Sequence, residues 1–175
     1  MPGLVLVINL GSSSLKAALV DAAGTRIWET NHRRSDGESL DAVLDQRLGP
    51  ALDSRRDAIT LVGHRVVHGG QRFTAPTLIT AALEQELRQL NHLAPLHNPP
   101  ALVGLAWVRR WAAELPQWAC FDTAFHSTLP EAAHTYALPE RLRQQGMRRY
   151  GFHGITRQHV AEQVAEKWSR DNKDS

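Results

Sequence analysis

The sequence lacks the features that mark several large protein classes. It has one cysteine, Cys120, so it can form no internal disulfide and no metal site built from several cysteines. No run of Lys or Arg exceeds two residues, and 20 basic residues balance 18 acidic ones, so we expect no nucleic-acid partner. The longest apolar run, Leu4 to Ile8, is far too short to cross a bilayer, so no membrane association is expected.

The amino terminus also has no basic segment before its first apolar run, which a secretory leader would carry. Apolar residues make up 42% of the 175 residues. That fraction is enough for one compact domain, or for one domain and part of another. Together these observations predict a soluble, cytoplasmic α/β protein.

Residues 4–30 predict a three-stranded meander. Leu4 to Ile8 is rich in β-branched residues and has no polar interruption, which indicates a strand buried on both faces. Leu15 to Val20 and Thr25 to Thr30 are the next two predicted strands, with Ile27 directed inward. No helical pattern separates the three strands, so the opening is not a βαβ unit.

Helical and strand patterns alternate after the meander. Ser35 and Glu38 have the spacing of a capping box before a helix that Gly49–Pro50 should end. The remaining predicted elements are a strand at Ile59–Val67, a helix capped by Thr80, a helix opened by Pro99–Pro100, a short strand at Trp118–Phe121, and a last helix with Val160, Val164 and Trp168 on one face. An exposed apolar face on that last helix would promote self-association.

Five segments place polar chemistry at the ends of these elements. In the first, Asn9 to Lys16, a glycine lets the backbone approach a ligand, and Ser12, Ser13 and Ser14 can donate to phosphate oxygens. The segment is not a P-loop, because the glycine spacing is absent and a strand follows it. An ordinary serine-rich hairpin is the alternative interpretation on local grounds.

The next three segments offer an arginine, a histidine and an aspartate. Arg65 lies between apolar residues at a strand end, where a guanidinium needs either a bound anion or an internal ion pair. Leu93–Pro100 is a proline-framed loop that presents His97, with Asn98 favoured as a helix cap. Asp122 ends an apolar strand, a position typical of a magnesium-linked carboxylate, or it caps a turn.

The fifth segment, Tyr150–Gly154, places Phe152 and His153 between two glycines, and a core histidine is the alternative interpretation. The five segments together supply a phosphate cradle, an anion clamp, a neutral donor and a metal carboxylate. That combination suits phosphoryl transfer, in which positioning and charge neutralisation supply most of the catalysis.

In their order and spacing, these five segments resemble acetate kinases from Leu4 to about Val160. The resemblance implies an α/β fold of the actin/Hsp70/sugar-kinase (ribonuclease H-like) type that opens with a three-stranded meander. It implies a first domain at residues 1–125 and the start of an incomplete second domain at residues 126–175. Ile155–Thr156–Arg157 and Leu10 depart from the family pattern without removing a named functional group.

The resemblance also implies an activity: reversible phosphoryl transfer from ATP to acetate, giving acetyl phosphate and ADP, with Mg²⁺ or Mn²⁺ as the metal. Propionate is the alternative substrate. Asp122, His153 and Arg65 would be catalytic, with Asp122 acting as the acid/base or orienting the metal. The remaining implied contacts are a substrate pocket of Arg65, Val67, Leu96, His97 and Phe152, ATP contacts from Lys16, Ser12, Ser13 and Ser14, and a metal contact from Asn9.

Members of that family are more than twice as long as this chain. The resemblance implies that most of their second domain has no counterpart here. We therefore expect the chain alone to be inactive. It would be either a truncated fragment or one half of a split enzyme whose C-terminal half is a separate chain. The resemblance implies a homodimer for the full-length protein.

Overall fold

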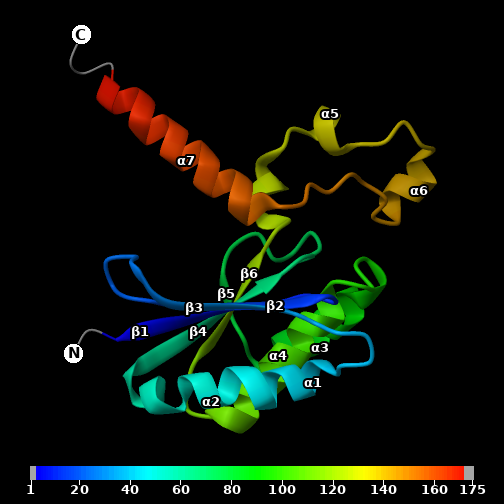
Figure 1. Ribbon diagram of the computed structural model, residues 1–175. Coiled ribbons are helices and arrows are strands. Elements are labelled where there is room, and N and C mark those ends of the chain that lie inside the picture. Colours follow the sequence, from blue (N-terminus) through cyan, green and yellow to red (C-terminus); the bar gives the residue numbers. More distant parts are fainter. Residues whose placement is uncertain (1–2, 172–175) are drawn as a thin grey trace.

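The computed structural model describes residues 3–171, and its centre is a six-stranded mixed sheet (Figure 1). The strands are β1 (Leu4–Leu10), β2 (Ser14–Val20), β3 (Arg26–Arg33), β4 (Ile59–Val66), β5 (Thr77–Leu78) and β6 (Gln117–Phe121). Their spatial order is β3-β2-β1-β4-β6-β5, with β1, β4 and β6 parallel and the others antiparallel to their neighbours. The predicted opening meander is confirmed as β1, β2 and β3.

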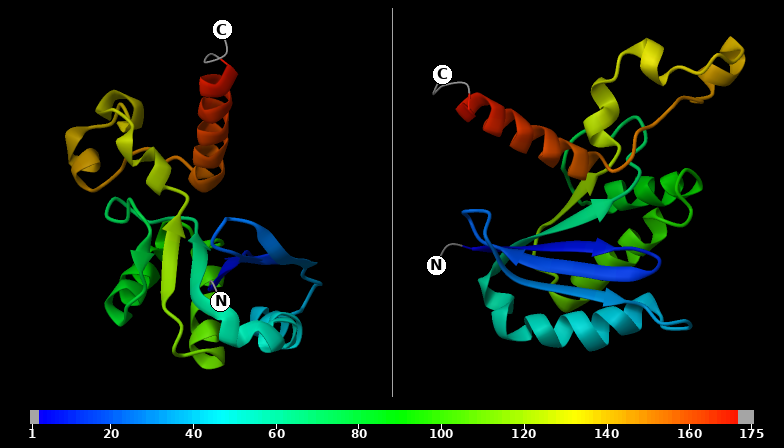
Figure 2. Two further views of the ribbon diagram at one scale, coloured as in Figure 1. Left: turned by 90° about the vertical axis from the view of Figure 1, so that its left-hand side faces the viewer. Right: turned by 45° about the horizontal axis from the view of Figure 1, so that its top comes forward.

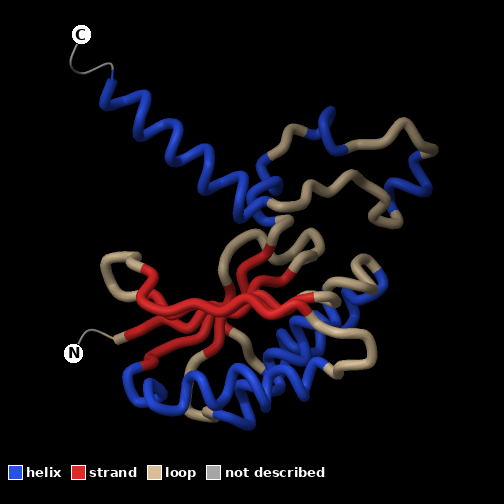
Figure 3. Tube along the Cα trace, viewed as in Figure 1, coloured by secondary structure: helices blue, strands red, loops and turns tan. Residues whose placement is uncertain are grey.

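Helices cover one face of this sheet, whereas the C-terminal part of the chain projects to its other side (Figures 1 and 2). The covering helices are α1 (Leu40–Val43), α2 (Gly49–Leu52), α3 (Ala81–Gln89) and α4 (Asn98–Trp111). The projecting helices are α5 (Glu131–His134), α6 (Glu140–Gln144) and α7 (Gly154–Asp171). Short π- and 3-10 turns link several of them, and the tube in Figure 3 shows how much of residues 128–153 is loop.

The apolar core lies between the sheet and α1 to α4. One buried cluster joins β1 and β2 to the helical run that contains α1 and α2, and a second joins β4 and β6 to α3 and α4. Trp107 on α4 is 2% exposed, and its indole Nε1 donates a 2.8 Å hydrogen bond to Asp45 Oδ1. The Trp107 and Trp111 rings stack 5.2 Å apart, as expected for residues that pack α4 against α1 and α2.

The prediction that Ile27 points inward is wrong, because its side chain is 50% exposed. The register between β2 and β3 explains the difference. Leu19 is buried and pairs with Trp28, and paired residues lie on the same face of a sheet, so Trp28 packs on the core. Because side chains alternate along a strand, the neighbouring Ile27 faces outward, and it is also the extra residue of a β-bulge, since Val20 pairs with Arg26.

The first helix also begins and ends away from its predicted limits. Ser39, not Ser35, caps it, because Ser39 Oγ accepts a 3.1 Å hydrogen bond from the Ala42 amide. Gly49–Pro50 does not end it: a π-turn precedes the pair and α2 follows, with Pro50 in the first turn, where its missing N–H costs nothing. The cap predicted for Thr80 is confirmed, since its Oγ1 accepts from the Leu83 amide at 3.2 Å.

Candidate active site

Three parallel strands bring three polar side chains to one edge of the sheet. Asn9 lies near the end of β1, Arg65 near the end of β4, and Asp122 directly after β6. Ligands of open α/β sheets bind outside the carboxyl ends of such strands. This edge is therefore the first place to seek a functional site.

Arg65 connects the other two residues. Its Nη2 lies 2.5 Å from Asp122 Oδ2, and its Nε lies 3.1 Å and 3.3 Å from the two carboxylate oxygens. Its Nη1 donates to Asn9 Oδ1 at 3.1 Å. The Asp122 side chain is 2% exposed and that of Arg65 is 30% exposed, so the guanidinium neutralises an almost fully buried carboxylate and still reaches the surface.

A cavity of about 400 Å³ opens beside this pair. Four separate segments of the chain form its walls: the end of β4, the loop before α4, the residue after β6, and the segment before α7. The lining residues are Arg65, Val67, Leu93, Ala94, Pro95, Leu96, His97, Asp122, Phe152 and His153. The structure thus brings together every residue that the resemblance assigned to catalysis or to the substrate pocket.

A tight turn brings His153 to the cavity. His153 has a positive φ of 58°, which is uncommon for a residue other than glycine. The next amide, that of Gly154, donates a 3.0 Å hydrogen bond to the Asp122 carbonyl oxygen. A Cβ on Gly154 would lie only 2.0 Å from that oxygen, so a glycine is required for α7 to begin directly against the end of β6.

His68 supports the Phe152 wall from behind. Its buried ring makes edge contacts with Tyr150 at 4.5 Å and with Phe152 at 5.8 Å between centroids. Burial lowers the pKa of His68, and the nearby His92 lowers it further. Its Nδ1 accepts a hydrogen bond from the Gly70 amide at 2.9 Å, which assigns a neutral ring with the proton on Nε2.

Asn98 supports the site from outside the cavity, in a role that the sequence pattern did not identify. The prediction that it caps α4 is wrong: His97 occupies the cap position, and no side-chain hydrogen bond caps the helix. Asn98 is 1% exposed, accepts from the His68 amide and donates to the His68 carbonyl oxygen. An asparagine before two prolines suits a helix cap and a bond to a distant backbone equally well. Only the tertiary contact with His68 shows which of the two roles Asn98 has.

The residues predicted to contact ATP do not line this cavity. Lys16 is exposed on β2 and pairs with Asn9 on β1, and both line a separate hollow of about 550 Å³ on the sheet. Ser12 and Ser13 are exposed in the turn between these strands. Arg34 fixes that turn, since its amide donates to the Ser13 carbonyl oxygen at 2.9 Å and its Nη1 donates to that of Ser12. Asn9 is the link between the hollow and the cavity, through its bond to Arg65.

The oxygen ligands at this edge fit magnesium only in part. Asn9 and Asp122 offer the amide and carboxylate oxygens that Mg²⁺ prefers, but both already accept hydrogen bonds from Arg65. Within residues 3–171, no group of three or more His, Cys, Asp or Glu side chains could hold a metal ion. The two residues therefore suit an ion that arrives on phosphate oxygens and keeps water ligands, not one enclosed by protein alone.

No helix within residues 3–171 is long and apolar enough to cross a membrane.

Comparison with known proteins gives one consistent family. The sequence model of the Acetokinase family matches residues 24–175. The chain is 42% identical to an acetate kinase of Deinococcus radiodurans over 94% of its length, and 43% identical to one of an Arthrobacter species over 93%. These matches cover 47% and 46% of the two relatives, so the chain spans about half the length of the curated relatives it matches.

Solved structures agree with the sequence comparison. A propionate kinase from Francisella tularensis matches 95% of the chain with a TM-score of 0.83 and 32% identity. An acetate kinase from Porphyromonas gingivalis matches 95% with a TM-score of 0.81 and 30% identity. Each match covers 49% of the solved chain. The predicted actin/sugar-kinase-like fold is thereby confirmed, and the chain belongs to the acetokinase family.

Proposed function

We propose that this chain carries the carboxylate-binding part of an acetate kinase, which transfers the γ-phosphoryl group of ATP reversibly to acetate. The main support is the single cavity in which Arg65, Asp122 and His153 lie beside an apolar wall of Val67, Leu96 and Phe152. A small carboxylate has the two parts that such a cavity matches, because its anionic end needs a guanidinium and its methyl group needs apolar contact.

In the proposed reaction, acetate lies with its carboxylate at Arg65 and its methyl group against Val67, Leu96 and Phe152. One carboxylate oxygen attacks the γ-phosphorus in line, the bond from phosphorus to the β–γ bridging oxygen breaks, and ADP leaves with that bonding pair. Arg65 and His153 neutralise charge on the transferring group. His97 adds a polar contact at the rim.

Asp122 has a positioning role in this proposal. A carboxylic acid is already ionised near neutral pH, so acetate needs no base to remove a proton before it attacks. The Asp122 carboxylate instead accepts hydrogen bonds from Arg65 Nε and Nη2, which holds the guanidinium against the cavity. We therefore favour an orienting role for Asp122, toward Arg65 and the metal, over acid/base catalysis.

ATP would meet the chain on the β1–β2 side. Lys16, Ser12, Ser13 and Ser14 would contact its phosphates, and Asn9 with Asp122 would hold Mg²⁺ or Mn²⁺. Such an ion supplies charge neutralisation at the phosphate oxygens. Asn9 is suited to this place because it lines the hollow beside Lys16 and also bonds Arg65 at the cavity.

Turnover would need more than the described residues. Arg65 is the one arginine among the described residues that line the cavity, and losing a single stabilising donor can cost about 10²–10³ in rate. We propose that residues 1–125 form the first domain and that residues 126–175 begin a second, completed by a C-terminal half on the same or a separate chain. The complete enzyme would be a cytoplasmic homodimer.

A hydroxamate assay for acetyl phosphate, with Mg-ATP, acetate and this chain alone, tests the need for that half. We expect no turnover above that of an Arg65→Ala variant. Binding is tested separately by titrating acetate against the methyl NMR signals of Val67 and Leu96, which should shift in the native chain and not in the variant. If neither acetate nor propionate shifts these methyl signals, the proposed carboxylate site is wrong. If the chain alone shows turnover that depends on Arg65, a second half is not needed.

Propionate is the second candidate substrate, favoured by the similarity to a solved propionate kinase. One methylene is worth only about 1–3 kcal/mol in an apolar pocket, so the two acids would differ by a modest factor. Measuring the affinities of acetate and propionate by the methyl titration would rank the two acids. The same measurement on a Val67→Ala variant tests the effect of a larger cavity. We expect Val67→Ala to shift the preference toward the longer acid.

A further inference from the structure

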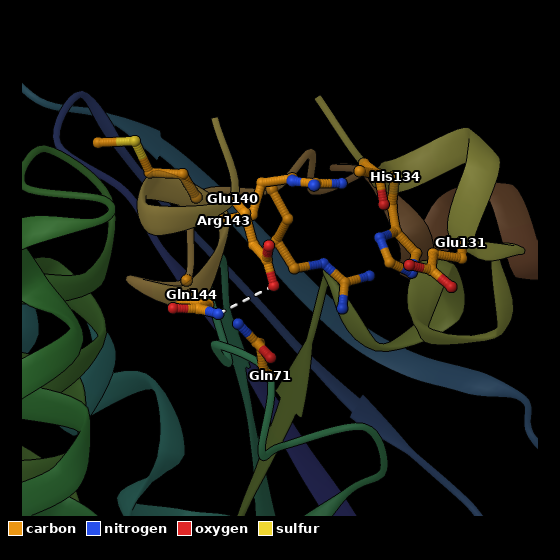
Figure 4. Close-up of a pocket in the computed structure, with 10 residues that line it drawn as sticks. Gln71, Glu131, His134, Glu140, Arg143 and Gln144 are labelled. Carbon is orange, nitrogen blue, oxygen red and sulfur yellow. Dashed lines mark hydrogen bonds between the residues drawn. The ribbon is translucent and has the colours of Figure 1, made fainter. Parts of the chain in front are cut away.

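A second cavity, of about 430 Å³, shares no lining residue with the carboxylate site, and Figure 4 shows the residues that line it. Gln71, from the loop after β4, forms one wall, and the segment that contains α5 and α6 forms the rest. Its lining residues are Gln71, Glu131, His134, Thr135, Glu140, Arg143, Gln144, Gly146, Met147 and Arg148. None of them belongs to the proposed kinase site.

Two arginines line this cavity without a carboxylate partner. Six other arginines of residues 3–171 form ion pairs with Asp or Glu besides Arg65, but Arg143 and Arg148 form none within that part of the chain. The Arg148 guanidinium lies 5.5 Å over the Tyr150 ring. Both cations are therefore available to an anion from solution.

His134 adds an independent observation. Its Nδ1 is buried and has no hydrogen-bond partner among the described residues, which is uncommon for a buried polar atom. In Figure 4, His134 on α5 and Arg143 on α6 lie on opposite sides of the hollow. A polar group left without a partner beside two guanidinium groups that form no ion pair indicates that something polar completes this site.

Two carboxylates set a limit on the ligand. Glu131 and Glu140 also line the cavity, and Glu140 Oε1 accepts a 3.1 Å hydrogen bond from Gln144 Nε2. The formal charges of two arginines and two glutamates cancel. We therefore expect weak binding of a small anion that the arginines can hold, not tight binding of a large polyanion.

We propose that this cavity binds a small oxyanion, a phosphate or a carboxylate, through Arg143 and Arg148 with His134 beside them. The site is separate from the carboxylate cavity, but a chain of side-chain contacts connects the two. Arg148 lies over Tyr150, the Tyr150 ring contacts His68, and His68 contacts Phe152, which lines the carboxylate cavity. Anion binding at Arg148 should therefore also shift the NMR signals of the Phe152 ring.

The test is an NMR titration of the native chain with inorganic phosphate and, separately, with succinate. We expect saturable shifts of the Arg143 and Arg148 Nε–H signals and of the His134 ring. An Arg143→Gln variant should bind roughly tenfold more weakly, because it loses a charge-assisted contact. The matched control is Arg141→Gln, since Arg141 is exposed on the same helix, does not line the cavity, and should leave the affinity unchanged.

Each outcome decides the proposal. Saturable shifts from both anions support a general oxyanion site, and shifts from one alone identify its class. The proposal is overturned if neither anion shifts these signals, if Arg143→Gln and Arg141→Gln bind equally well, or if the shifts occur only at Arg65 and Val67. The last result would assign the binding to the proposed kinase site, which the acetate titration tests separately.

Discussion

The side chain of Asn98 makes two hydrogen bonds to the backbone of His68, one to its amide and one to its carbonyl oxygen, each 3.0 Å long. The two residues follow directly after two cavity walls, His97 in one segment and Val67 in the other. Asn98 therefore fixes the start of α4 to the end of β4 and sets the distance between these walls.

Replacing Asn98 with alanine should destabilise the chain by about 2–4 kcal/mol, because both groups of the buried His68 backbone lose their partner. Urea unfolding measures this directly. Asn91→Ala is the matched control in the 3-10 turn that follows α3, since the buried Asn91 Oδ1 has no hydrogen-bond partner among the described residues. Equal losses in the two variants would contradict the role given to Asn98.

The ion pair between Arg65 and Asp122 should show strong coupling. Arg65→Gln leaves a nearly buried carboxylate without its cation and should cost about 2–3 kcal/mol, below the usual range for buried pairs because Arg65 is partly exposed. Adding Asp122→Asn should restore part of that loss. A double-mutant cycle in urea checks this, and additive effects would show that the pair contributes no coupling.

The position of Gly154 should tolerate no side chain. Gly154→Ala would force a Cβ to 2.0 Å from the Asp122 carbonyl oxygen and 2.9 Å from Phe125 Cβ. We expect α7 to move away from β6, seen as faster proteolysis at the start of α7. Gly63→Ala is the control, because a Cβ there meets no atom within 4 Å, and it should be cleaved at the native rate.

Stability should fall in mild acid because of His64. Burial lowers its pKa from 6.5 to about 4, against a smaller opposing effect of the hydrogen bond with Gln117. Between these values the unfolded chain binds more protons than the folded chain, so this contribution is complete above pH 6.5 and is lost as the pH falls toward 4. The loss from this residue is on the order of 3 kcal/mol.

Urea unfolding of the native chain from pH 7.5 to pH 4 measures that dependence, and His64→Gln should flatten it. A residual slope of the same sign is expected from His68, whose pKa is also lowered by burial. His159→Gln, on the exposed surface of α7, should leave the profile unchanged. An unaltered slope in His64→Gln would show that His64 is not the group that titrates.

The outer face of α7 should drive self-association. Val160 and Val164 lie one turn apart on it and are 54% and 61% exposed. Replacing both with glutamate should shift sedimentation toward the monomer, while Gln163→Glu, also on an exposed position of α7, should not. A native chain that sediments as a monomer at all concentrations would contradict this expectation.

The sequence alone was sufficient for features that depend on neighbours along the chain. The β-branched run at Leu4 to Ile8, the turn after it and the cap at Thr80 each indicated their element, because β-branching and capping act locally. The expected burial of both faces of that first strand was wrong, since Val7 is 39% exposed. The polar residues Arg65, Asp122 and His153 were identified from their places at the ends of elements. The resemblance then supplied the roles proposed for them.

The tertiary structure decided what depends on contacts between distant residues. Arg65 forms an ion pair with Asp122, 57 residues further along, and it also lines the cavity. The sequence had offered an internal ion pair and an anion site as alternatives for Arg65, and the structure allows both. The bond of Asn98 to His68, and the pairing of Trp28 with Leu19 that leaves Ile27 facing outward, likewise follow from packing and register. A residue pattern predicts which side of a segment is buried in the core. It does not predict which residues of another segment will pack against that side.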